Sequence, residues 1–326
     1  MRSRCRQLDR VRKQEGFGAP RCYSALVPEL PDIELYLMCM RSRVLDRALE
    51  RVRITSPSLL RTFEPDVAVV EGRVVRSLAR LGKRVVIGLD GDLYLVVHLM
   101  ISGRLRWKAG PSTIAKPGGL ASAQFMFSDG TLTLTETSTR KRASLHVVQG
   151  DDALRALDPG GIEPLAATRA TFVERLVAVN RTIKRALTDP ATIAGIGDAY
   201  SDEILHAAKL SPVKLTSRIT DGEWTRLHEA TQMTLRAWTA RLQRAVMHAF
   251  PGPGDVTAFR PEFAAHGRFR QPCPVCGTAI QRIVRGDHET NYCPRCQTDG
   301  KLLADRSLSR LLKDDWPASM DAWEGM

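Results

Sequence analysis

Four cysteines near the C-terminus have the spacing of a metal site. They form two C-x2-C pairs with sixteen residues between the pairs: Cys273, Cys276, Cys293 and Cys296. Each pair can place two thiolates on one side of a metal ion, and a hairpin between the pairs would complete a tetrahedron of sulfur ligands. Two disulfides are the competing interpretation, but nothing in the sequence indicates an oxidising compartment. We therefore expect one structural Zn²⁺.

A second group of residues able to do chemistry lies toward the other end of the chain. Pro28 and Glu29 precede a predicted helix, and Asp32 falls in the first turn of that helix. Lys83 lies in a Gly-Lys-Arg turn just before a predicted strand. Taken singly, the two acids are ordinary residues of a helix start and Lys83 is an ordinary turn lysine.

Two glycines could shape a binding site for an anion. Gly195 and Gly197 suit a turn whose backbone amides approach a phosphate at the start of a helix. An ordinary corner between two helices explains the same residues. The Arg140-Lys-Arg142 triplet is equally ambiguous, because a run of charge is usually a solvated face.

The charge balance favours a polyanionic partner. The 326 residues include 48 Lys and Arg against 36 Asp and Glu, a formal charge of +12. Nucleic acid is the commonest partner of such a chain, although a solvated basic face gives the same total. With 43% hydrophobic and 26% charged residues, the composition excludes disorder, collagen-like repeats and a disulfide scaffold.

The first 27 residues carry an uneven share of this charge. They contain seven basic residues against two acidic ones, and they lack the apolar run of a secretory signal. An organelle transit peptide, a disordered tail and untranslated residues are the open interpretations. No stretch of the chain has the length of apolar sequence that a membrane span needs.

Predicted elements divide the chain into parts that could position these groups. A helix begins near Pro31 and buries Cys39 on its apolar face. Short β-rich runs then predict an antiparallel sandwich or barrel, with Asp90-Gly91 and Asp129-Gly130 as hairpin turns. The β-rich region extends from Val52 to Val148, and its predicted strands include Val74–Leu78, Arg84–Leu89, Tyr94–Leu99, Ala123–Phe127 and Thr131–Thr135.

Two breaks rich in proline and glycine set the domain boundaries. Asp158-Pro-Gly-Gly161 precedes a mainly helical region, and Phe250-Pro-Gly-Pro-Gly254 precedes the cysteines. Beyond Cys296, leucines at helical spacing are predicted to pack onto the body. The predicted parts are a basic extension (1–27), a β-sandwich (28–150), a helical domain (160–255), a zinc finger (260–300) and a tail (301–326).

The order of these motifs resembles the formamidopyrimidine-DNA glycosylase and endonuclease VIII family. The resemblance runs from Pro28 through the segment Ile193–Glu203 to about Cys296. It implies an α+β fold: an N-terminal antiparallel β-sandwich with flanking helices, a helical helix-two-turn-helix domain and a C-terminal zinc-finger β-hairpin. Double-stranded DNA would lie in the cleft between the two lobes.

The resemblance also implies a reaction and its residues. An oxidised purine of the formamidopyrimidine or 8-oxoguanine type is excised, and the abasic strand is cleaved by lyase chemistry. The nucleophile is the secondary amine of an N-terminal proline, matched here by Pro28, which forms a Schiff base at C1′. Glu29 would act as acid and base at the sugar with Asp32 nearby, and Lys83 would support cleavage of the glycosylic bond.

Further residues match the family's contacts with DNA. The resemblance places Lys184 on a phosphate, and Asp198 and Tyr200 within the helix-two-turn-helix segment that faces DNA. Arg140 and Arg142 lie in the basic stretch that reaches into the duplex. Two other positions match the family with a different residue. Ile101 stands where the family has a methionine that fills the gap left by the flipped base, and His288 stands where the family has a finger arginine that assists the second elimination.

Several positions depart from the family pattern. Asp198 stands where asparagine is usual, and a carboxylate would repel a phosphate that an amide would bind. Asp32 replaces a glutamate, and Ala143 is the nearest match to an aromatic wedge. His288 replaces the finger arginine, with Arg282 and Arg285 close by. These changes bear on lesion preference and on the choice between β and β,δ elimination.

The N-terminal extension conflicts with the implied chemistry. With residues 1–27 attached, the nitrogen of Pro28 is a tertiary amide and has no free lone pair. Initiation at Val27, followed by removal of the initiating methionine, would release Pro28. Proteolytic processing, or a protein without this activity, are the alternatives.

We expect a zinc-containing bifunctional DNA glycosylase and lyase that flips a base out of duplex DNA. It is expected to be a monomer in the bacterial cytoplasm, associated with the nucleoid. A catalytically inactive protein that binds damaged or unusual DNA is the main alternative. A zinc-ribbon transcription or RNA-associated factor would explain the cysteines but leaves Pro28, Glu29 and Lys83 unexplained.

Overall fold

The computed structural model describes residues 27–111, 119–138, 140–247, 249–252, 254–257, 260–285 and 288–303. Residues 1–26 of the basic extension, with Cys5 and Cys22, lie outside the described part. The same holds for residues 304–326, which include the predicted leucine positions 308, 311 and 312.

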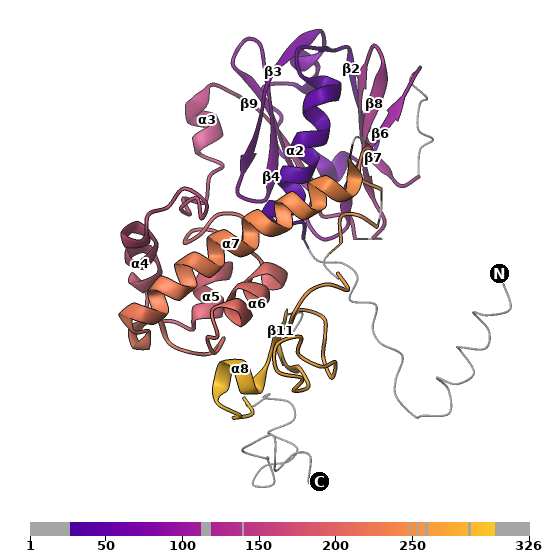
Figure 1. The fold of residues 1–326 in the computed structure, drawn as a ribbon. Helices are drawn as coiled ribbons and strands as arrows, with labels where there is room; N and C mark the ends of the chain where they lie inside the picture. The colour runs from indigo at the N-terminus through magenta and orange to yellow at the C-terminus, as the bar shows by residue number, and fades with distance from the viewer. Residues whose placement is uncertain are drawn as a thin grey trace, which may run out of the picture.

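The first lobe is a β-sandwich of two antiparallel sheets, as predicted (Figure 1). One sheet has the order β1-β3-β4-β5-β9, and the other has the order β2-β7-β8-β6. The strands of the first sheet are β1 (Ala48–Leu49), β3 (Arg73–Leu81), β4 (Arg84–Leu89), β5 (Leu93–His98) and β9 (Ser144–Gln149). Those of the second are β2 (Arg51–Ile54), β6 (Gly103–Ala109), β7 (Ala121–Phe127) and β8 (Gly130–Glu136). Both Asp-Gly turns join paired strands, β4 to β5 and β7 to β8.

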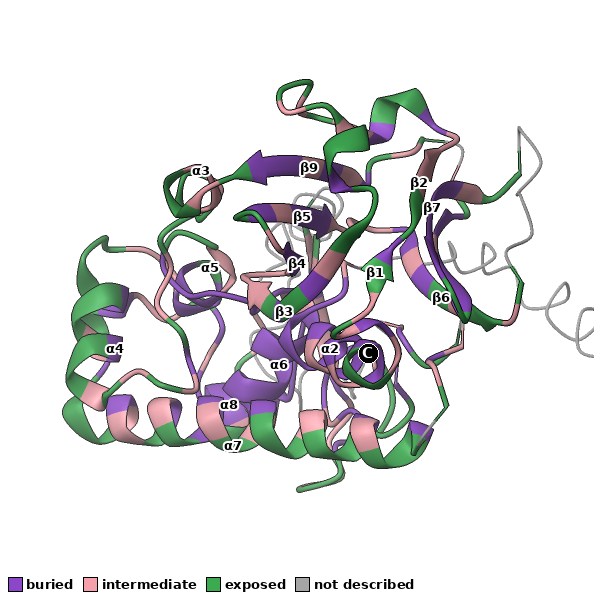
Figure 2. Cartoon of the chain, turned by 90° about the horizontal axis from the view of Figure 1, so that it is seen from above, coloured by how far each residue is buried: buried purple, intermediate pink, exposed green. Residues whose placement is uncertain are grey.

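The helix α2 (Leu30–Val44) packs against this sandwich and sets where the candidate catalytic residues lie (Figure 2). A capping box formed by Glu29 and Asp32 begins the helix, and Pro31 lies in its first turn. Tyr36 is fully buried in the sandwich core, and Cys39 is 3% exposed, as predicted for a small apolar position. The position of Glu29 and Asp32 is therefore fixed by the core beneath the helix.

The second lobe is helical, and its longest helix belongs to both lobes. In α7 (Asp221–Val246), Leu227 and Leu235 pack in the helical core, whereas Leu242 and Val246 pack in the sandwich core. Figure 1 shows α7 running from the helical lobe to the base of the sandwich. The other helices are α3 (Asp151–Arg155), α4 (Arg169–Val177), α5 (Ile183–Thr188) and α6 (Asp198–Ala207), with short 3-10 turns at Pro57–Leu59, Val67–Val70 and Thr216–Arg218.

A small module follows α7. It contains the antiparallel hairpin β10 (Gln281–Arg285) and β11 (His288–Tyr292), and the short helix α8 (Pro294–Thr298). Cys273, Ile280 and Cys293 form its buried core. Among the described residues, no helix is both long and apolar enough to cross a lipid bilayer.

Candidate active site and nucleic-acid interface

The side chain of Glu29 joins the sandwich lobe to the helical lobe. Its carboxylate accepts a hydrogen bond from the Ala199 amide at 2.9 Å and another from the Gly197 amide, both at the start of α6. Glu29 is 3% exposed. Burial raises its pKa, and the nearby Lys83 charge and these two amide hydrogen bonds act in the opposite direction. An acid whose pKa is raised toward neutrality can exchange a proton more readily than an exposed carboxylate.

The turn before α6 lies beside both Lys83 and the Glu29 carboxylate. A Cβ atom on Gly197 would lie 2.5 Å from the Lys83 Nζ and 2.7 Å from the Glu29 Cδ, so a larger residue there would displace these two side chains. Gly195 has a φ of +81° and lies against Leu30, whose amide donates to the Gly195 carbonyl at 2.9 Å. The two glycines thus let the turn approach the start of α2 closely.

The amides of this turn have a partner within the protein. The sequence left a phosphate site and an ordinary helix corner as the two interpretations, and in the structure the amides of Gly197 and Ala199 donate to the Glu29 carboxylate. A buried carboxylate satisfies the free amides of a helix start as an anionic ligand would. The sequence alone could not identify this acceptor, because Glu29 lies 168 positions before Gly197.

Pro28 immediately precedes this arrangement and is buried. Because Val27 is attached to it, its nitrogen is an amide nitrogen in the chain from Met1. Asp32 also lies here, and its Oδ2 accepts from the Glu29 amide at 3.0 Å. The structure therefore brings Pro28, Glu29, Asp32 and Lys83 together, from two segments far apart in the sequence.

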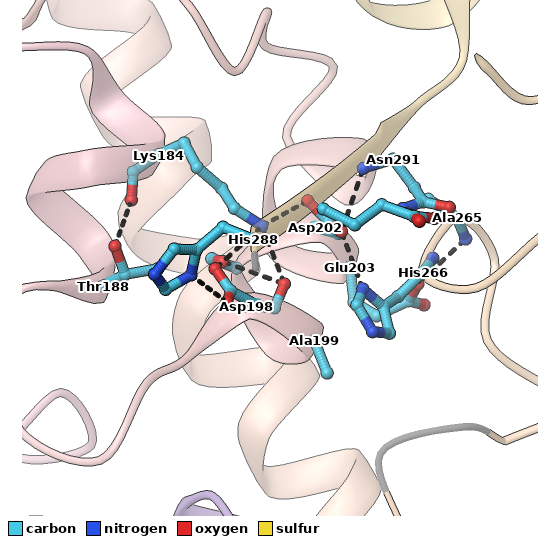
Figure 3. A network of polar contacts seen from close by, with 12 residues as sticks. Lys184, Thr188, Asp198, Ala199, Asp202, Glu203, Ala265, His266, His288 and Asn291 are labelled. Atoms are coloured by element: carbon cyan, nitrogen blue, oxygen red, sulfur yellow. Dashed lines mark hydrogen bonds and ion pairs between the residues drawn. The ribbon is translucent and has the colours of Figure 1, made fainter. Parts of the chain in front are cut away.

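Lys184 and Asp198 meet at the start of α6 (Figure 3). The Lys184 Nζ donates to the Asp198 carbonyl at 2.8 Å and to the Asp202 Oδ1 at 2.5 Å. His288 of the finger hairpin completes the group, since its Nδ1 lies 2.8 Å from the Asp198 Oδ2. Burial favours a raised pKa for Asp198, but the charges of Lys184 and His288 outweigh it and hold this pKa below its ordinary value.

Asp202 and Glu203 connect the same helix to the segment that leads into the finger. Asp202 is fully buried, and its Oδ2 lies 2.8 Å from His266 Nδ1 and accepts from the Asn291 amide at 3.1 Å. Glu203 accepts from three successive amides, those of residues 264, 265 and 266, at 2.7 to 2.9 Å. The hydrogen bond and charge of Asp202 raise the pKa of His266, against the effect of burial. The sequence did not predict a role for these residues.

Removing the charge of Lys184 is expected to destabilise the fold. Breaking a buried ion pair from one side costs about 3–5 kcal/mol, and Lys184→Met should fall at the lower end because His266 still faces Asp202. Urea denaturation measures this loss. Lys209→Met is the matched control, because Lys209 is exposed. Adding Asp202→Asn to Lys184→Met should recover part of the lost free energy of unfolding. Equal midpoints for Lys184→Met and Lys209→Met would contradict the prediction.

The remaining predicted DNA contacts lie on loops of the sandwich. Ile101 is partly exposed between β5 and β6, and the Arg104 side chain donates to its carbonyl at 3.1 Å. Arg140 and Arg142 are exposed between β8 and β9. The amide of Arg142 donates to the buried Glu136 at 2.8 Å, which shapes this loop. These three side chains are accessible to a ligand, and their roles on DNA stay predictions.

Tyr200 corrects one predicted contact. Its side chain is 1% exposed and packs edge to face against Phe263 and Trp238, so the ring is part of the helical core and does not form a DNA surface. The motif around it suggested a contact because neighbouring positions face the turn. Residues at successive positions of a helix point in different directions, and Tyr200 points inward.

The four cysteines converge as the spacing predicts. Their sulfur atoms all lie within 4.8 Å of one another, with 3.9 Å between Cys273 and Cys296 and 3.4 Å between Cys276 and Cys293. Zinc–thiolate bonds of about 2.3 Å in a tetrahedron need sulfur atoms about 3.8 Å apart, so the donor set fits Zn²⁺. His206 of α6 lies 3.2 Å from the Cys273 sulfur through its Nε2, a contact that the sequence did not predict.

Zinc removal is expected to unfold the finger. Among the described residues, the buried hydrophobic cluster at the sulfurs contains only Cys273, Ile280 and Cys293, so we expect the metal to supply most of the stability of the module. Purified protein should hold one zinc ion, and Cys293→Ser should lose it and become sensitive to protease between residues 270 and 298. Cys39→Ser, outside the finger, should keep the ion. Retention of zinc by Cys293→Ser would contradict this assignment.

Comparison with known proteins agrees with this arrangement along the chain. Three family models match it: the formamidopyrimidine-DNA glycosylase N-terminal domain at 27–145, the formamidopyrimidine-DNA glycosylase H2TH domain at 161–246, and a zinc finger found in FPG and IleRS at 270–298. The formamidopyrimidine-DNA glycosylase of Geobacillus kaustophilus is 32% identical over 278 residues, covering 83% of this chain and all of the relative. That of Symbiobacterium thermophilum is 32% identical over 279 residues, covering 83% and 89%.

Solved structures agree in fold. Fpg of Lactococcus lactis in complex with DNA containing an abasic site superposes with a TM-score of 0.73 at 25% identity, covering 83% of this chain and 99% of that one. The β-sandwich, the helix-two-turn-helix lobe and the four-cysteine finger define a zinc-finger protein of the DNA glycosylase class. The chain belongs to the formamidopyrimidine-DNA glycosylase family.

Proposed function

We propose that this protein removes oxidised purines from double-stranded DNA and then cleaves the strand at the abasic sugar. The observation that carries the proposal is the position of the Glu29 carboxylate, which lies at the start of α6 beside Lys83 and directly after Pro28. A nucleophile, an acid and a cation then converge where the two lobes meet. The relatives that bear the glycosylase name span most of this chain.

In the proposed reaction the free amine of Pro28 attacks C1′ of the damaged nucleotide. The N–C1′ bond forms as the bond from C1′ to the base breaks, and the base leaves with that electron pair and takes up a proton. The amine then loses its own proton, the C1′–O4′ bond breaks with O4′ taking a proton, and a positively charged iminium, the Schiff base of a secondary amine, remains. Its positive charge accepts electrons when a proton leaves C2′ and the 3′ C–O bond breaks. Glu29 exchanges protons at the sugar, and the Lys83 ammonium stabilises negative charge at the departing groups.

The active form in this proposal begins at Pro28. An amide nitrogen cannot form the Schiff base, whereas a terminal amine with a pKa of about 8 is partly neutral near pH 7. Initiation at Val27 or proteolysis would release it. Asp32 then supports the site, because its Oδ2 holds the Glu29 amide and its Oδ1 holds Arg260.

DNA would contact the exposed loops and the start of α6. We propose that Ile101 enters the gap left by the flipped base and that Arg140 and Arg142 approach the opposite strand. Lys184, Asp198 and His288 would face the phosphates, with the Lys184 ammonium and the His288 ring beside the Asp198 carboxylate. We propose a monomer acting on nucleoid DNA in the cytoplasm, since the relatives named above are bacterial.

Borohydride trapping tests the proposal directly. Protein beginning at Pro28 is mixed with duplex DNA that contains an abasic site, and the reductant converts a Schiff base into a stable amine. We expect a covalent adduct whose DNA is attached to the N-terminal peptide, and no adduct, at matched DNA occupancy, once the terminal amine of Pro28 has been acetylated. Tight DNA binding without an adduct would instead identify a catalytically inactive DNA-binding protein.

A further inference from the structure

Arg260 reaches the start of α2 from the segment that links α7 to the finger. Its Nη2 donates to the Asp32 Oδ1 at 2.6 Å, across 228 positions of sequence. The side chains are only 8% and 5% exposed, so each is the other's partner in a site almost closed to water. A buried charge needs such a partner, because transfer from water costs several kcal/mol per ion.

The two oxygens of Asp32 have separate partners. While Oδ1 accepts from Arg260, Oδ2 accepts from the Glu29 amide at 3.0 Å. That amide belongs to the peptide group between Pro28 and Glu29. Because a carboxylate is rigid and planar, the position of the guanidinium determines the direction in which Asp32 holds this peptide group.

The charged groups around Asp32 make its ionisation depend on Arg260. The other nearby ionisable groups are the Arg104 cation, the Glu29 carboxyl, and the phenols of Tyr36 and Tyr200. Burial raises the pKa of Asp32, and Arg260 is the main group that opposes this rise. The guanidinium also donates to the Asp255 carbonyl at 3.1 Å, which ties the linker to the same point.

We propose that Arg260 is a positioning residue for the reaction at Pro28, acting through Asp32 and the peptide group that follows the proline. The proposal rests on the function proposed above. A displacement of about 1 Å at a reacting group can lower a rate about 100-fold. Arg260 therefore affects the chemical step and leaves DNA affinity largely unchanged.

Amide hydrogen exchange in the full chain tests the positional part without any activity. In Arg260→Met, the Glu29 amide is expected to exchange about tenfold faster or more than in the parent chain. Arg241→Met is the control, because it removes the same charge from an exposed pair with Glu262 on the same linker. Unchanged exchange at Glu29, or equal acceleration in both variants, would overturn the proposal.

Single-turnover trapping tests the catalytic part in protein that begins at Pro28. This form is suitable because the match to the N-terminal domain begins at residue 27 and the chain covers the whole of a relative. Arg260→Met should slow trapping about 10- to 100-fold at neutral pH with unchanged affinity for an uncleavable abasic analogue. The loss should shrink as the pH rises and Asp32 ionises.

Arg260→Lys provides a second variant that keeps the buried cation, and it should recover part of the rate. An unchanged rate in Arg260→Met, or a loss that is constant with pH and matched by lost affinity, would overturn the catalytic role. If the parent protein itself forms no adduct, the proposed function fails. Hydrogen exchange then still decides whether Arg260 positions Glu29.

Discussion

Protein that begins at Pro28 is expected to be trapped on abasic DNA about 10³-fold faster, or more, than the chain that begins at Met1. Loss of a covalent nucleophile lowers catalysis by several orders of magnitude, and the amide nitrogen between Val27 and Pro28 is not a nucleophile. The measurement is the rate of adduct formation with borohydride at saturating protein.

A protein beginning at Val27 separates two explanations of this difference. It lacks the basic segment but still holds the Pro28 nitrogen in an amide bond. We expect it to be as inactive as the chain from Met1. If it were as active as protein beginning at Pro28, the nucleophile would not be the Pro28 amine, and obstruction by the basic segment would explain the difference.

Glu29→Gln is expected to lower the rate of strand cleavage about 10²- to 10⁴-fold, the usual effect of removing a group that transfers protons. The substitution keeps the size of the side chain, but its amide group cannot exchange a proton at the sugar. Glu34→Gln is the matched control, because Glu34 lies on the same helix and pairs with Arg80. Equal rates for the two variants would exclude Glu29 from the reaction.

The same substitution has a defined effect on the pH dependence of stability. The pKa of Glu29 is raised by burial, so the folded protein binds this proton more tightly than the unfolded chain. Its stabilising contribution is therefore full below the ordinary value of 4.5 and is lost as the pH rises through the raised pKa. The stability of Glu29→Gln relative to the parent should rise over that range. Urea denaturation at several pH values would show it, and a relative fall would contradict it.

Local patterns were sufficient for some of the elements and for the metal site. The span Arg84–Leu89 was predicted with its observed bounds, and the cysteine spacing predicted the sulfur cluster. The strand Gly103–Ala109 was missed, although its charged residues alternate with Leu105 and Trp107 as they do in a half-buried strand. Helical periodicity also could not show that α7 packs in two cores, because the period reports a buried face and not its partner.

The residues that assemble the site were harder to find. Pro28, Glu29 and Lys83 were selected through a family resemblance, whereas Arg260 and His206 had no local signal. Their partners lie 228 and 67 positions away, and only the folded chain brings them together. Tyr200 shows the opposite error, since a residue inside an informative motif is buried in the core.

The contacts of helix α6 determine which segments could be exchanged between related enzymes. Glu29 docks on its first turn, Asp202 and Glu203 bind the finger and its linker, and His206 contacts a cysteine sulfur. A finger transplanted alone would meet side chains suited to a different sequence. The smallest interchangeable unit in a chimaeric enzyme is therefore the finger together with α6, although 61 or more positions of sequence separate their contacts.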